Sequence, residues 1–275
     1  MLLLHGLSGS PLEMQYLGRQ LRAAGFTVHN PAIPGCAFGT RADPFDTGTW
    51  QQWLAFAAGE LEALNQEHGQ VCVAGLCIGA VLALRLAIER PEQVRAMALI
   101  STTLAYDGWA MPWYRVLAPI AYHTPLRRVI AWPERHPYGL KNERLREWIV
   151  RAMDAHGASA AGAAYLPLSG IHEAHRVIKA VRRDVARASA PALVMHAVDD
   201  DVASTRSAEF VARHIGSKDV RTILYHDSYH ILTLDNDKDA VAEETIGFFH
   251  RHLAADAEPA AAPADARRKR RLSIA

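Results

Sequence analysis

Residues 71–84 are Val71-Cys72-Val73-Ala74-Gly75-Leu76-Cys77-Ile78-Gly79-Ala80-Val81-Leu82-Ala83-Leu84. The first four residues form a short apolar run typical of a buried parallel strand, and the last five begin a helical pattern. Between them, G-x-C-x-G is the pattern of a nucleophile elbow with Cys77 at its centre. Glycine on each side of the nucleophile lets strand and helix approach closely. The stretch therefore predicts a strand, a strained turn that presents Cys77, and a helix; an ordinary strand-to-helix turn is the alternative.

The same alternation of strand and helix recurs along the chain. Short apolar runs typical of buried parallel strands alternate with longer segments of helical period, as in an α/β sheet that is covered on both faces. We expect strands near residues 2–5, 27–33, 70–76, 95–101, 192–198 and 220–226, and helices near 11–24, 50–67, 79–90, 204–215 and 238–253. Six strands with crossover helices predict one open, mostly parallel sheet with helices on both faces.

Residues 103–185 interrupt this alternation. They contain several prolines, arginine-rich helical pieces and four tryptophans, at positions 109, 113, 132 and 148. We interpret the segment as an inserted helical cap near the carboxyl ends of the strands, where open α/β sheets bind ligands. A second small domain unrelated to the site is the alternative.

The last residues, 254–275, are rich in Ala, Pro and charge and end in a basic cluster at 267–271. Such a composition cannot bury a core and predicts a disordered tail, with a tether to an anionic surface or a phosphorylation recognition site as the alternatives. One α/β domain over residues 1–253, with the cap inserted in it, is the organisation that we expect.

The composition limits the classes of partner. Thirty Lys and Arg stand against 29 Asp and Glu, a formal charge of +1, so no global field recruits nucleic acid or an anionic membrane. No apolar run is long enough for a membrane-spanning segment. The three cysteines, Cys36, Cys72 and Cys77, are neither even in number nor spaced as zinc ligands, which fits free thiols in a reducing compartment. We expect a cytoplasmic protein that acts on a small molecule.

A second motif, Leu2-Leu3-Leu4-His5-Gly6-Leu7-Ser8-Gly9, ends an early strand in a glycine-containing turn. Acyl transfer needs backbone N–H groups aimed at the oxyanion of the tetrahedral intermediate. By position, these donors are Leu7 and Ile78. Without the elbow, the same turn would be read as a plain end of a strand.

An acid and a base follow the elbow in the order nucleophile, Asp, His. Asp200 follows the strand near 192–198, and His230 follows the strand near 220–226, so both lie at carboxyl ends of strands. We prefer Asp200 over Asp199 and Asp201, either of which could cap the next helix. We prefer His230 over His226 because His230 lies in the loop, where a base can reach the elbow.

With these motifs, the chain resembles the α/β-hydrolase family, specifically bacterial carboxylesterases and monoacylglycerol-lipase-like enzymes with a small helical cap. The similarity covers residues 1 to about 253 and is carried by 4–9, 75–79, 196–202 and 228–235. It implies Asp200, two residues before Val202, as the acid. The chain departs from the family in two ways. The further strands that generally precede the oxyanion turn are absent, so either the start is truncated or the sheet lacks an edge, where unpaired backbone would be a stability problem. Cysteine also stands where esterases have serine. Cysteine at this position is similar to dienelactone hydrolases and polyhydroxyalkanoate synthases.

These residues together predict a carboxylesterase or thioesterase in which Cys77 attacks the acyl carbonyl, His230 moves the proton and Asp200 orients His230. A thiolate is favoured by the neighbouring histidine and helix N-terminus, and a thioester intermediate makes transfer to an alcohol, amine or thiol an alternative to hydrolysis. We expect no cofactor and no metal.

Four further expectations concern the surroundings of the triad. Trp109, Trp113 and Tyr114 of the cap suggest an apolar acyl or aromatic group, although core packing explains aromatic residues equally well. A non-catalytic ligand-binding protein and a redox sensor that pairs Cys77 with Cys36 stay as alternatives. So does a metal site built from the following four residues: His196, Asp200, Asp227 and His230.

Overall fold

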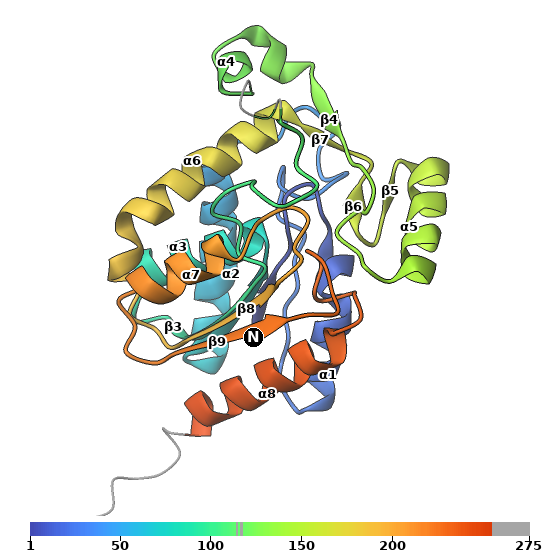
Figure 1. Ribbon diagram of the computed structural model, residues 1–275. Helices are drawn as coiled ribbons and strands as arrows, with labels where there is room; N and C mark the ends of the chain where they lie inside the picture. Colours follow the sequence, from blue (N-terminus) through green and yellow to red (C-terminus); the bar gives the residue numbers. More distant parts are fainter. Residues whose placement is uncertain (114, 116–117, 255–275) are drawn as a thin grey trace, which may run out of the picture.

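The central sheet is parallel and open. A computed structural model describes residues 1–113, 115 and 118–254. The strands are β1 (Leu2–Leu4), β2 (Val71–Leu76), β3 (Val94–Ile100), β8 (Ala192–Ala197) and β9 (Val220–Tyr225), in the order β1-β2-β3-β8-β9 (Figure 1). Every neighbouring pair is parallel. The predicted open, mostly parallel sheet is confirmed.

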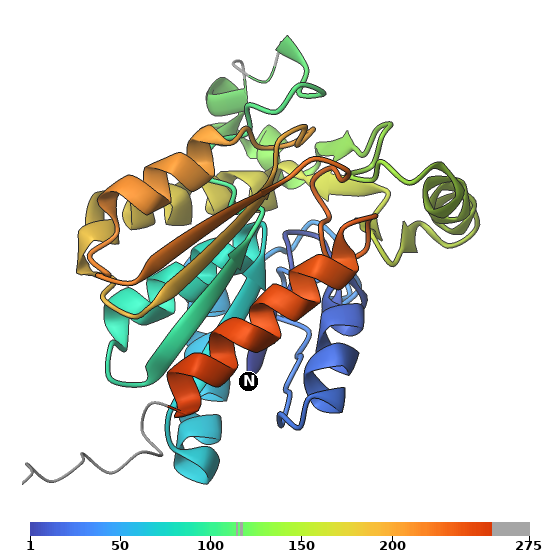
Figure 2. The ribbon, with the colours of Figure 1, turned by 60° about the horizontal axis from the view of Figure 1, so that its bottom comes forward.

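Helices cover both faces of this sheet. One face packs against α2 (Trp50–His68), α3 (Ile78–Glu89), α6 (Leu168–Asp184) and α7 (Arg206–His214), and the other packs against α1 (Gln15–Ala23) and α8 (Lys238–Ala254). Figure 2 shows α8 and α1 together on one side of the strands. Alternate residues of each strand serve the two cores, because successive side chains of a strand point to opposite faces. In the part of the chain that is described, no helix is both long and apolar enough to cross a bilayer.

The predicted strand near 27–33 is wrong. His29 makes a single bridge to Leu2, in which Leu3 N–H donates to His29 O at 2.9 Å and His29 N–H donates to Met1 O at 2.8 Å. Pro31 and Pro34 follow His29 closely. Proline has no backbone N–H that could donate a hydrogen bond to a neighbouring strand. The described sheet therefore has five strands instead of six, with β1 at one edge.

The segment between β3 and β8 is partly antiparallel, whereas the sequence predicted only helices there. It contains α4 (Ala118–Tyr122), η3 (Pro125–Arg128), β4 (Ala131–Pro133), α5 (Glu143–His156), β5 (Ala158–Ser159), β6 (Gly162–Ala163) and β7 (Tyr165–Pro167), followed by α6 and η4 (Val185–Arg187). β4 pairs with β7 and β5 pairs with β6. Figure 1 shows α4, β4 and α5 beyond one end of the sheet, whereas α6 returns to pack on the sheet.

The helix expected near 11–24 forms in two parts. A 3-10 turn, η1 (Pro11–Met14), precedes α1, and the Ser10 side chain accepts a hydrogen bond from Leu12 N–H at 3.2 Å. Proline suits the first position of such a turn because the missing N–H would have no partner there. η1 is the next element after β1, so its side chains lie beside the carboxyl end of the sheet.

Candidate active site

Cys77 occupies a strained turn between β2 and α3. Its backbone angles are φ 56° and ψ −117°, a left-handed conformation that a residue with a side chain rarely adopts, and Cys77 N–H donates to Ile100 O at 3.0 Å. A Cβ added to Gly79 would lie 2.1 Å from Leu4 O, and one added to Gly75 would lie 2.3 Å from Gly79 O. Glycine is therefore required at both positions, and the predicted strand, turn and helix are confirmed.

The thiol of Cys77 faces a small cavity at the carboxyl end of the sheet. Its Sγ lies 3.3 Å from Oγ1 of Thr103, which in turn lies 3.2 Å from Ser101 O. The cavity has a volume of about 70 Å³ and is called the nucleophile cavity below. It is lined by Gly6, Leu7, Glu13, Leu76, Cys77, Tyr106, Glu134, Tyr138, Gly139, Met153, Ala161, Leu166, Val202, His230 and Ile231.

Asp200 and His230 meet beside this cavity. His230 Nδ1 lies 2.8 Å from Oδ2 and 3.0 Å from Oδ1 of Asp200, and both side chains are buried. Asp200 Oδ1 also accepts the N–H groups of Val202 and Ala203, each at 2.8 Å. These three donor groups fix the carboxylate in one orientation, so Nδ1 carries the proton of His230 and Nε2 is left to act.

The second ring nitrogen of His230 is unpaired, and His230 lines the nucleophile cavity together with Cys77. His230 is only 6% exposed, and its Nε2 has no hydrogen-bond partner among the described residues. Burial alone would lower the pKa of His230, but the charges of Asp200 and Cys77 raise it well above its usual value. Burial, the largest single effect, would raise the pKa of Asp200, but the charge of His230 and the hydrogen bonds from His230 and Ala203 together lower it.

The neighbouring candidates have other contacts. Asp199 is exposed and lies 3.7 Å from the Nζ of Lys141, while Asp201 is buried and accepts the N–H groups of Gly139 at 3.0 Å and His230 at 3.2 Å. Neither caps α7, whose N-cap residue Thr205 makes no side-chain cap hydrogen bond. His226 is exposed on the strand side of the loop. Of the three aspartates, only Asp200 contacts the His230 ring.

The four residues of the alternative metal site do not gather around one point. His196 Nε2 donates to Ala203 O at 2.8 Å and lies 3.3 Å from Asp200 Oδ2, but Asp227 is exposed and lies 3.8 Å from the Nζ of Lys141. Within residues 1–113, 115 and 118–254, no group of three or more His, Cys, Asp or Glu side chains could hold a metal ion. Burial lowers the pKa of His196, so its ring is held neutral.

The turn after β1 is fixed by a neutral histidine. Ile33 N–H donates to Nε2 of His5 at 3.0 Å, so Nδ1 carries the proton and donates to Gly6 O at 2.8 Å. Burial lowers the pKa of His5 to about 4. Cys36 packs beside the same turn: its buried Sγ lies 3.8 Å from Gly6 O, and burial raises its pKa. A thiol in this state is a poor redox partner for Cys77.

Leu7 and Ile78 flank Cys77 as the sequence predicts. Leu7 lines the nucleophile cavity, and Ile78 is the first residue of α3. Neither backbone N–H donates a hydrogen bond to any described residue. Both amides are therefore free to bind an oxygen atom at the reaction centre.

A larger, mostly apolar cavity of about 410 Å³ adjoins the nucleophile cavity and is called the apolar cavity below. Tyr106, Glu134, Leu166 and Val202 line both. The others that line it are Leu104, Ala105, Ala110, Met111, Pro112, Arg115, Tyr122, Trp132, Pro133, Arg135, His136, Leu168, Ile171, His175 and Asp201. The two cavities together can hold a small polar group next to a longer apolar one.

Two of the three predicted aromatic contacts of the substrate, Trp109 and Trp113, lie outside both cavities. Trp109 is 59% exposed, and its Nε1–H donates to Asp199 O at 2.9 Å; Trp113 is 77% exposed. Neither lines the nucleophile cavity or the apolar cavity, although their neighbours Met111 and Pro112 do. Tyr114 lies outside the described residues. The role of these three residues stays a prediction.

Sequence reasoning missed two carboxyl groups of the nucleophile cavity, those of Glu13 and Glu134. Glu13 follows Ser10 at the spacing of a capping box, a pattern that places a glutamate at the surface of a helix start. In the structure its Oε2 instead accepts Gly6 N–H at 2.8 Å. Glu134 follows β4, and no local sequence pattern predicts that β4 pairs with β7.

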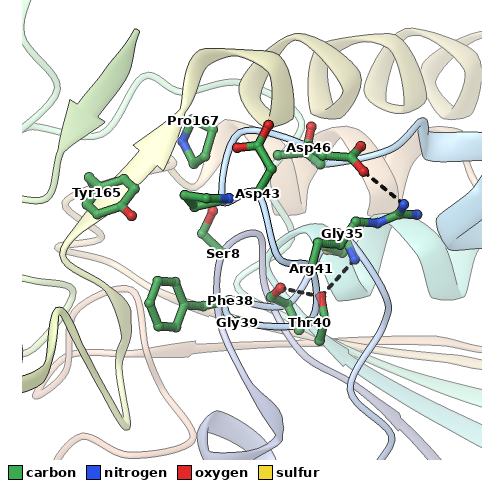
Figure 3. Close-up of a pocket in the computed structure, with 14 residues that line it drawn as sticks. Ser8, Gly35, Phe38, Gly39, Thr40, Arg41, Asp43, Asp46, Tyr165 and Pro167 are labelled. Atoms are coloured by element: carbon green, nitrogen blue, oxygen red, sulfur yellow. Dashed lines mark hydrogen bonds and ion pairs between the residues drawn. The ribbon is translucent and has the colours of Figure 1, made fainter. Parts of the chain in front are cut away.

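A separate hollow of about 20 Å³ lies over residues 35–47 and 165–167 (Figure 3). It is closed by contacts within its own loop: Arg41 Nη1 lies 3.0 Å from Asp46 Oδ2, and Thr40 Oγ1 accepts Gly35 N–H at 2.9 Å. A hollow of this size holds no more than about one water molecule. It is too small to hold an acyl group.

Comparisons with known proteins agree with this arrangement. The family model described as "Serine aminopeptidase, S33" matches residues 1–237. A thermostable monoacylglycerol lipase of Bacillus sp. (strain H-257) is 24% identical over 251 residues, which are 91% of this chain and 90% of that protein. A carboxylesterase of Bacillus subtilis (strain 168) is 22% identical over 255 residues, which are 91% of this chain and 92% of that protein.

A solved structure from work on LipS and LipT, two metagenome-derived lipolytic enzymes, superposes with a TM-score of 0.76. It is 24% identical and covers 91% of this chain and 93% of its own. A likeness at this level of identity shows the fold, which is the α/β-hydrolase fold that the sequence motifs predict.

Proposed function

We propose that this chain, which belongs to the α/β-hydrolase family described as "Serine aminopeptidase, S33", is an acyl-transfer enzyme of the carboxylesterase or thioesterase type. Cys77 is the nucleophile, His230 the general base and Asp200 the residue that orients it. One observation carries the proposal: His230 donates from Nδ1 to Asp200 at 2.8 Å while its unpaired Nε2 belongs to the cavity that Cys77 lines. That is the geometry in which an imidazole moves a proton to and from a nucleophile.

In the first step, Cys77 Sγ bonds to the acyl carbonyl carbon, and the thiol proton passes to Nε2 of His230. The carbonyl electron pair moves to the oxygen, where the free amides of Leu7 and Ile78 bind the oxyanion. When the intermediate collapses, the bond to the alcohol or thiol breaks, and His230 returns its proton to the leaving group. The product is an acyl thioester on Cys77.

In the second step, water attacks the thioester carbon, and His230 Nε2 takes a proton from it. Collapse of the second intermediate breaks the C–S bond, releases the carboxylic acid and returns the proton to Cys77. Asp200 stabilises the imidazolium in both steps and is not itself protonated. The strong positive shift of the pKa of His230 is consistent with a stable imidazolium beside the thiolate.

The apolar cavity supports a substrate with an apolar acyl group. Its volume of about 410 Å³ and its mostly apolar walls suit an acyl chain, and it adjoins the reacting thiol through the lining that both cavities share. The monoacylglycerol lipase and the carboxylesterase that resemble this chain are named for ester substrates. We therefore infer an ester or thioester as the bond that is cleaved.

A second candidate is transfer of the acyl group to an alcohol, amine or thiol instead of water. The observation that favours it is the sulfur of Cys77, because an acyl thioester exchanges with amines and thiols more readily than an acyl serine does. Cys77→Ser separates the two. If the serine variant gains ester hydrolysis while the wild type favours added acceptors, the native enzyme is a transferase.

Intact-mass analysis tests the proposal. After incubation with p-nitrophenyl hexanoate or with a hexanoyl thioester, we expect one hexanoyl group on the wild type and none on Cys77→Ala. Cys36→Ala is the matched control, because Cys36 is a buried thiol of the same protein that has no role in the proposed chemistry. No adduct on the wild type, or an adduct that persists in Cys77→Ala, contradicts the proposal.

A further inference from the structure

The nucleophile cavity contains two carboxyl groups that the proposed triad does not use. Glu13 enters from η1 below the cavity, and Glu134 enters from the segment that follows β4. Each lines the cavity together with Cys77 and His230. Acidic side chains beside a nucleophile disfavour both the thiolate and the oxyanion, so their presence calls for a positive charge that comes with the ligand.

Glu13 is held in place without a cation. It is 4% exposed, and its Oε2 accepts Gly6 N–H at 2.8 Å. Its carboxyl fills space that glycine leaves open, since a Cβ on Gly9 would lie 2.2 Å from Oε1. Among the described residues, no Lys or Arg pairs with it, and burial raises its pKa to about 7. An ordinary structural carboxylate would be paired and would have a lowered pKa.

Glu134 also lacks a cation, although it is half-buried where Glu13 is buried. Burial, followed by the charge of Asp201, raises its pKa to about 7, and in the described part of the chain it makes no ion pair. Asp201 cannot take over its role, because its two oxygens already accept the N–H groups of Gly139 and His230. Glu13 and Glu134 are thus the acidic groups of the cavity with oxygen atoms left to bind a ligand.

Two more polar atoms in the cavity lack partners. His230 Nε2 belongs to a side chain that is only 6% exposed, and the buried hydroxyl of Tyr106 also has no hydrogen-bond partner in residues 1–113, 115 and 118–254. Buried polar atoms are nearly always hydrogen-bonded, so atoms left unpaired around one cavity indicate that a polar ligand completes them. This observation is independent of the two carboxyls.

The distribution of charge indicates which kind of ligand fits. Among the described residues, the nucleophile cavity is lined by Glu13 and Glu134 and by no Lys or Arg, whereas Arg115 and Arg135 line the apolar cavity. His230 supplies one positive charge, which Asp200 already balances. A buried carboxylate such as that of Glu13, with a second carboxylate in the same cavity, needs a further cation to stay ionised. The small volume of about 70 Å³ limits that cation to a compact group.

Given the acyl-transfer function proposed above, we propose that Glu13 and Glu134 form a subsite in the nucleophile cavity, beside Cys77, that binds the protonated amine of an amino alcohol. The amino alcohol is the leaving group of the acyl substrate or the acceptor of the acyl group. The ammonium lies between the two carboxylates, and its oxygen end reaches the acyl carbon at Cys77. A neutral alcohol of the same shape leaves the carboxyls without a partner.

Matched pairs of compounds test this subsite. 2-(Dimethylamino)ethyl hexanoate and 3-methylbutyl hexanoate have the same shape and differ in charge, as do 2-(dimethylamino)ethanol and 3-methylbutan-1-ol when they serve as acceptors from p-nitrophenyl hexanoate. We expect kcat/KM of the wild type to favour the charged member by about tenfold or more at pH 8, as for a hydrogen bond to a charged group. Preference among the esters identifies a leaving group, and preference among the alcohols identifies an acceptor.

Isosteric variants assign the preference to the two carboxyls. Glu13→Gln keeps the acceptor for Gly6 N–H, and we expect Glu13→Gln and Glu134→Gln each to lower the charged-to-neutral ratio about tenfold. Glu92→Gln, at an exposed position away from both cavities, is the control and leaves the ratio unchanged. A ratio near one in the wild type, or one that neither cavity variant changes, overturns the proposal.

A binding experiment separates this subsite from the acyl chemistry. Calorimetry with Cys77→Ala compares N-[2-(dimethylamino)ethyl]hexanamide with N-(3-methylbutyl)hexanamide, neither of which needs to be cleaved. Tighter binding of the charged amide, lost in Cys77→Ala/Glu13→Gln, supports the subsite even if no acyl-enzyme is ever detected. Equal affinity for the two amides overturns the subsite even if Cys77 is acylated.

Discussion

One carboxylate oxygen of Asp200, Oδ2, lies 2.8 Å from Nδ1 of His230, and the same oxygen lies 3.3 Å from Nε2 of His196 on its other side. His196 is neutral and is held by Ala203 O, so the charge of Asp200 acts on His230. The carboxylate therefore fixes which nitrogen of His230 carries a proton and stabilises the imidazolium.

Asp200→Asn removes this charge with little change of shape. An amide can present either an acceptor or a donor to Nδ1 and allows the wrong tautomer of His230, so we expect kcat for ester cleavage to fall by about 10⁴-fold. Steady-state kinetics with p-nitrophenyl hexanoate measures the loss. Asp199→Asn, at the neighbouring exposed position, is the control and changes kcat little. Equal losses in the two variants contradict the assignment of Asp200.

The elbow glycines permit a second test, on stability. Gly79→Ala places a Cβ between α3 and β1, 2.1 Å from Leu4 O. The backbone of neither element can move away without a large cost in free energy. We expect the free energy of unfolding to fall by about 2 kcal/mol or more, as for other overpacked sites. Gly59→Ala in α2 meets no atom within 4 Å and is expected to stabilise by about 0.5–1 kcal/mol. Urea denaturation of both variants measures these free energies of unfolding. A small change in Gly79→Ala contradicts the packing argument.

The raised pKa of Glu13 predicts a pH-dependent stability. Burial lifts it from 4.5 to about 7, so the folded state holds a proton that the unfolded state has already released, and stability is lost as the pH rises through this window. Glu13→Gln has no such proton. We expect it to match the wild type near pH 5 and to be more stable near pH 8, by on the order of 3 kcal/mol.

Urea denaturation at the two pH values checks the prediction for Glu13, with Glu92→Gln as the exposed control. Glu92 lies at the surface, so its replacement should leave the pH dependence as it is. If Glu13→Gln differs from the wild type by the same amount at pH 5 and pH 8, the carboxyl of Glu13 is not held protonated by burial.

The apolar cavity predicts the preferred length of the acyl chain. Ile171 of α6 lines it, so Ile171→Trp fills part of its volume. We expect kcat/KM for octanoyl esters to fall by about tenfold or more, while acetyl esters, which end near Cys77, are cleaved as before. Ile120→Trp, on the exposed side of α4, is the control. A uniform loss over all chain lengths would mean that the acyl group binds elsewhere.

Much of the fold and of the arrangement around Cys77 was predictable because the signals are local. Gly75, Cys77 and Gly79 stand within five residues, and the strained turn they form needs no distant partner to be recognised. Asp200 and His230 were predictable for a different reason: both follow strands of one parallel sheet, and the carboxyl ends of parallel strands meet at one edge. Because β8 and β9 are neighbours in the sheet, the residues that follow them lie close enough to make the contact at 2.8 Å.

Other features depend on contacts that no local pattern encodes. The residues near 27–33 have the apolar content of a strand but only a single bridge, because two prolines deprive the segment of donors. Trp109 is expected from its residue type to contact the substrate; its indole N–H donates to Asp199 O, and its role stays a prediction. For residues 27–33 the strand propensity was real and the surroundings overruled it.

Glu13 shows most clearly where local information ends. Its spacing from Ser10 predicts an exposed glutamate at a helix start, and Ser10 does cap η1. The sequence alone predicts the strand, the strained turn at Cys77 and the order of the proposed acid and base. These features follow from near neighbours in the chain and from the direction of parallel strands. Only packing of η1 and β4 around one cavity placed Glu13 and Glu134 beside Cys77, since burial and the lack of a cation are properties of the folded surroundings.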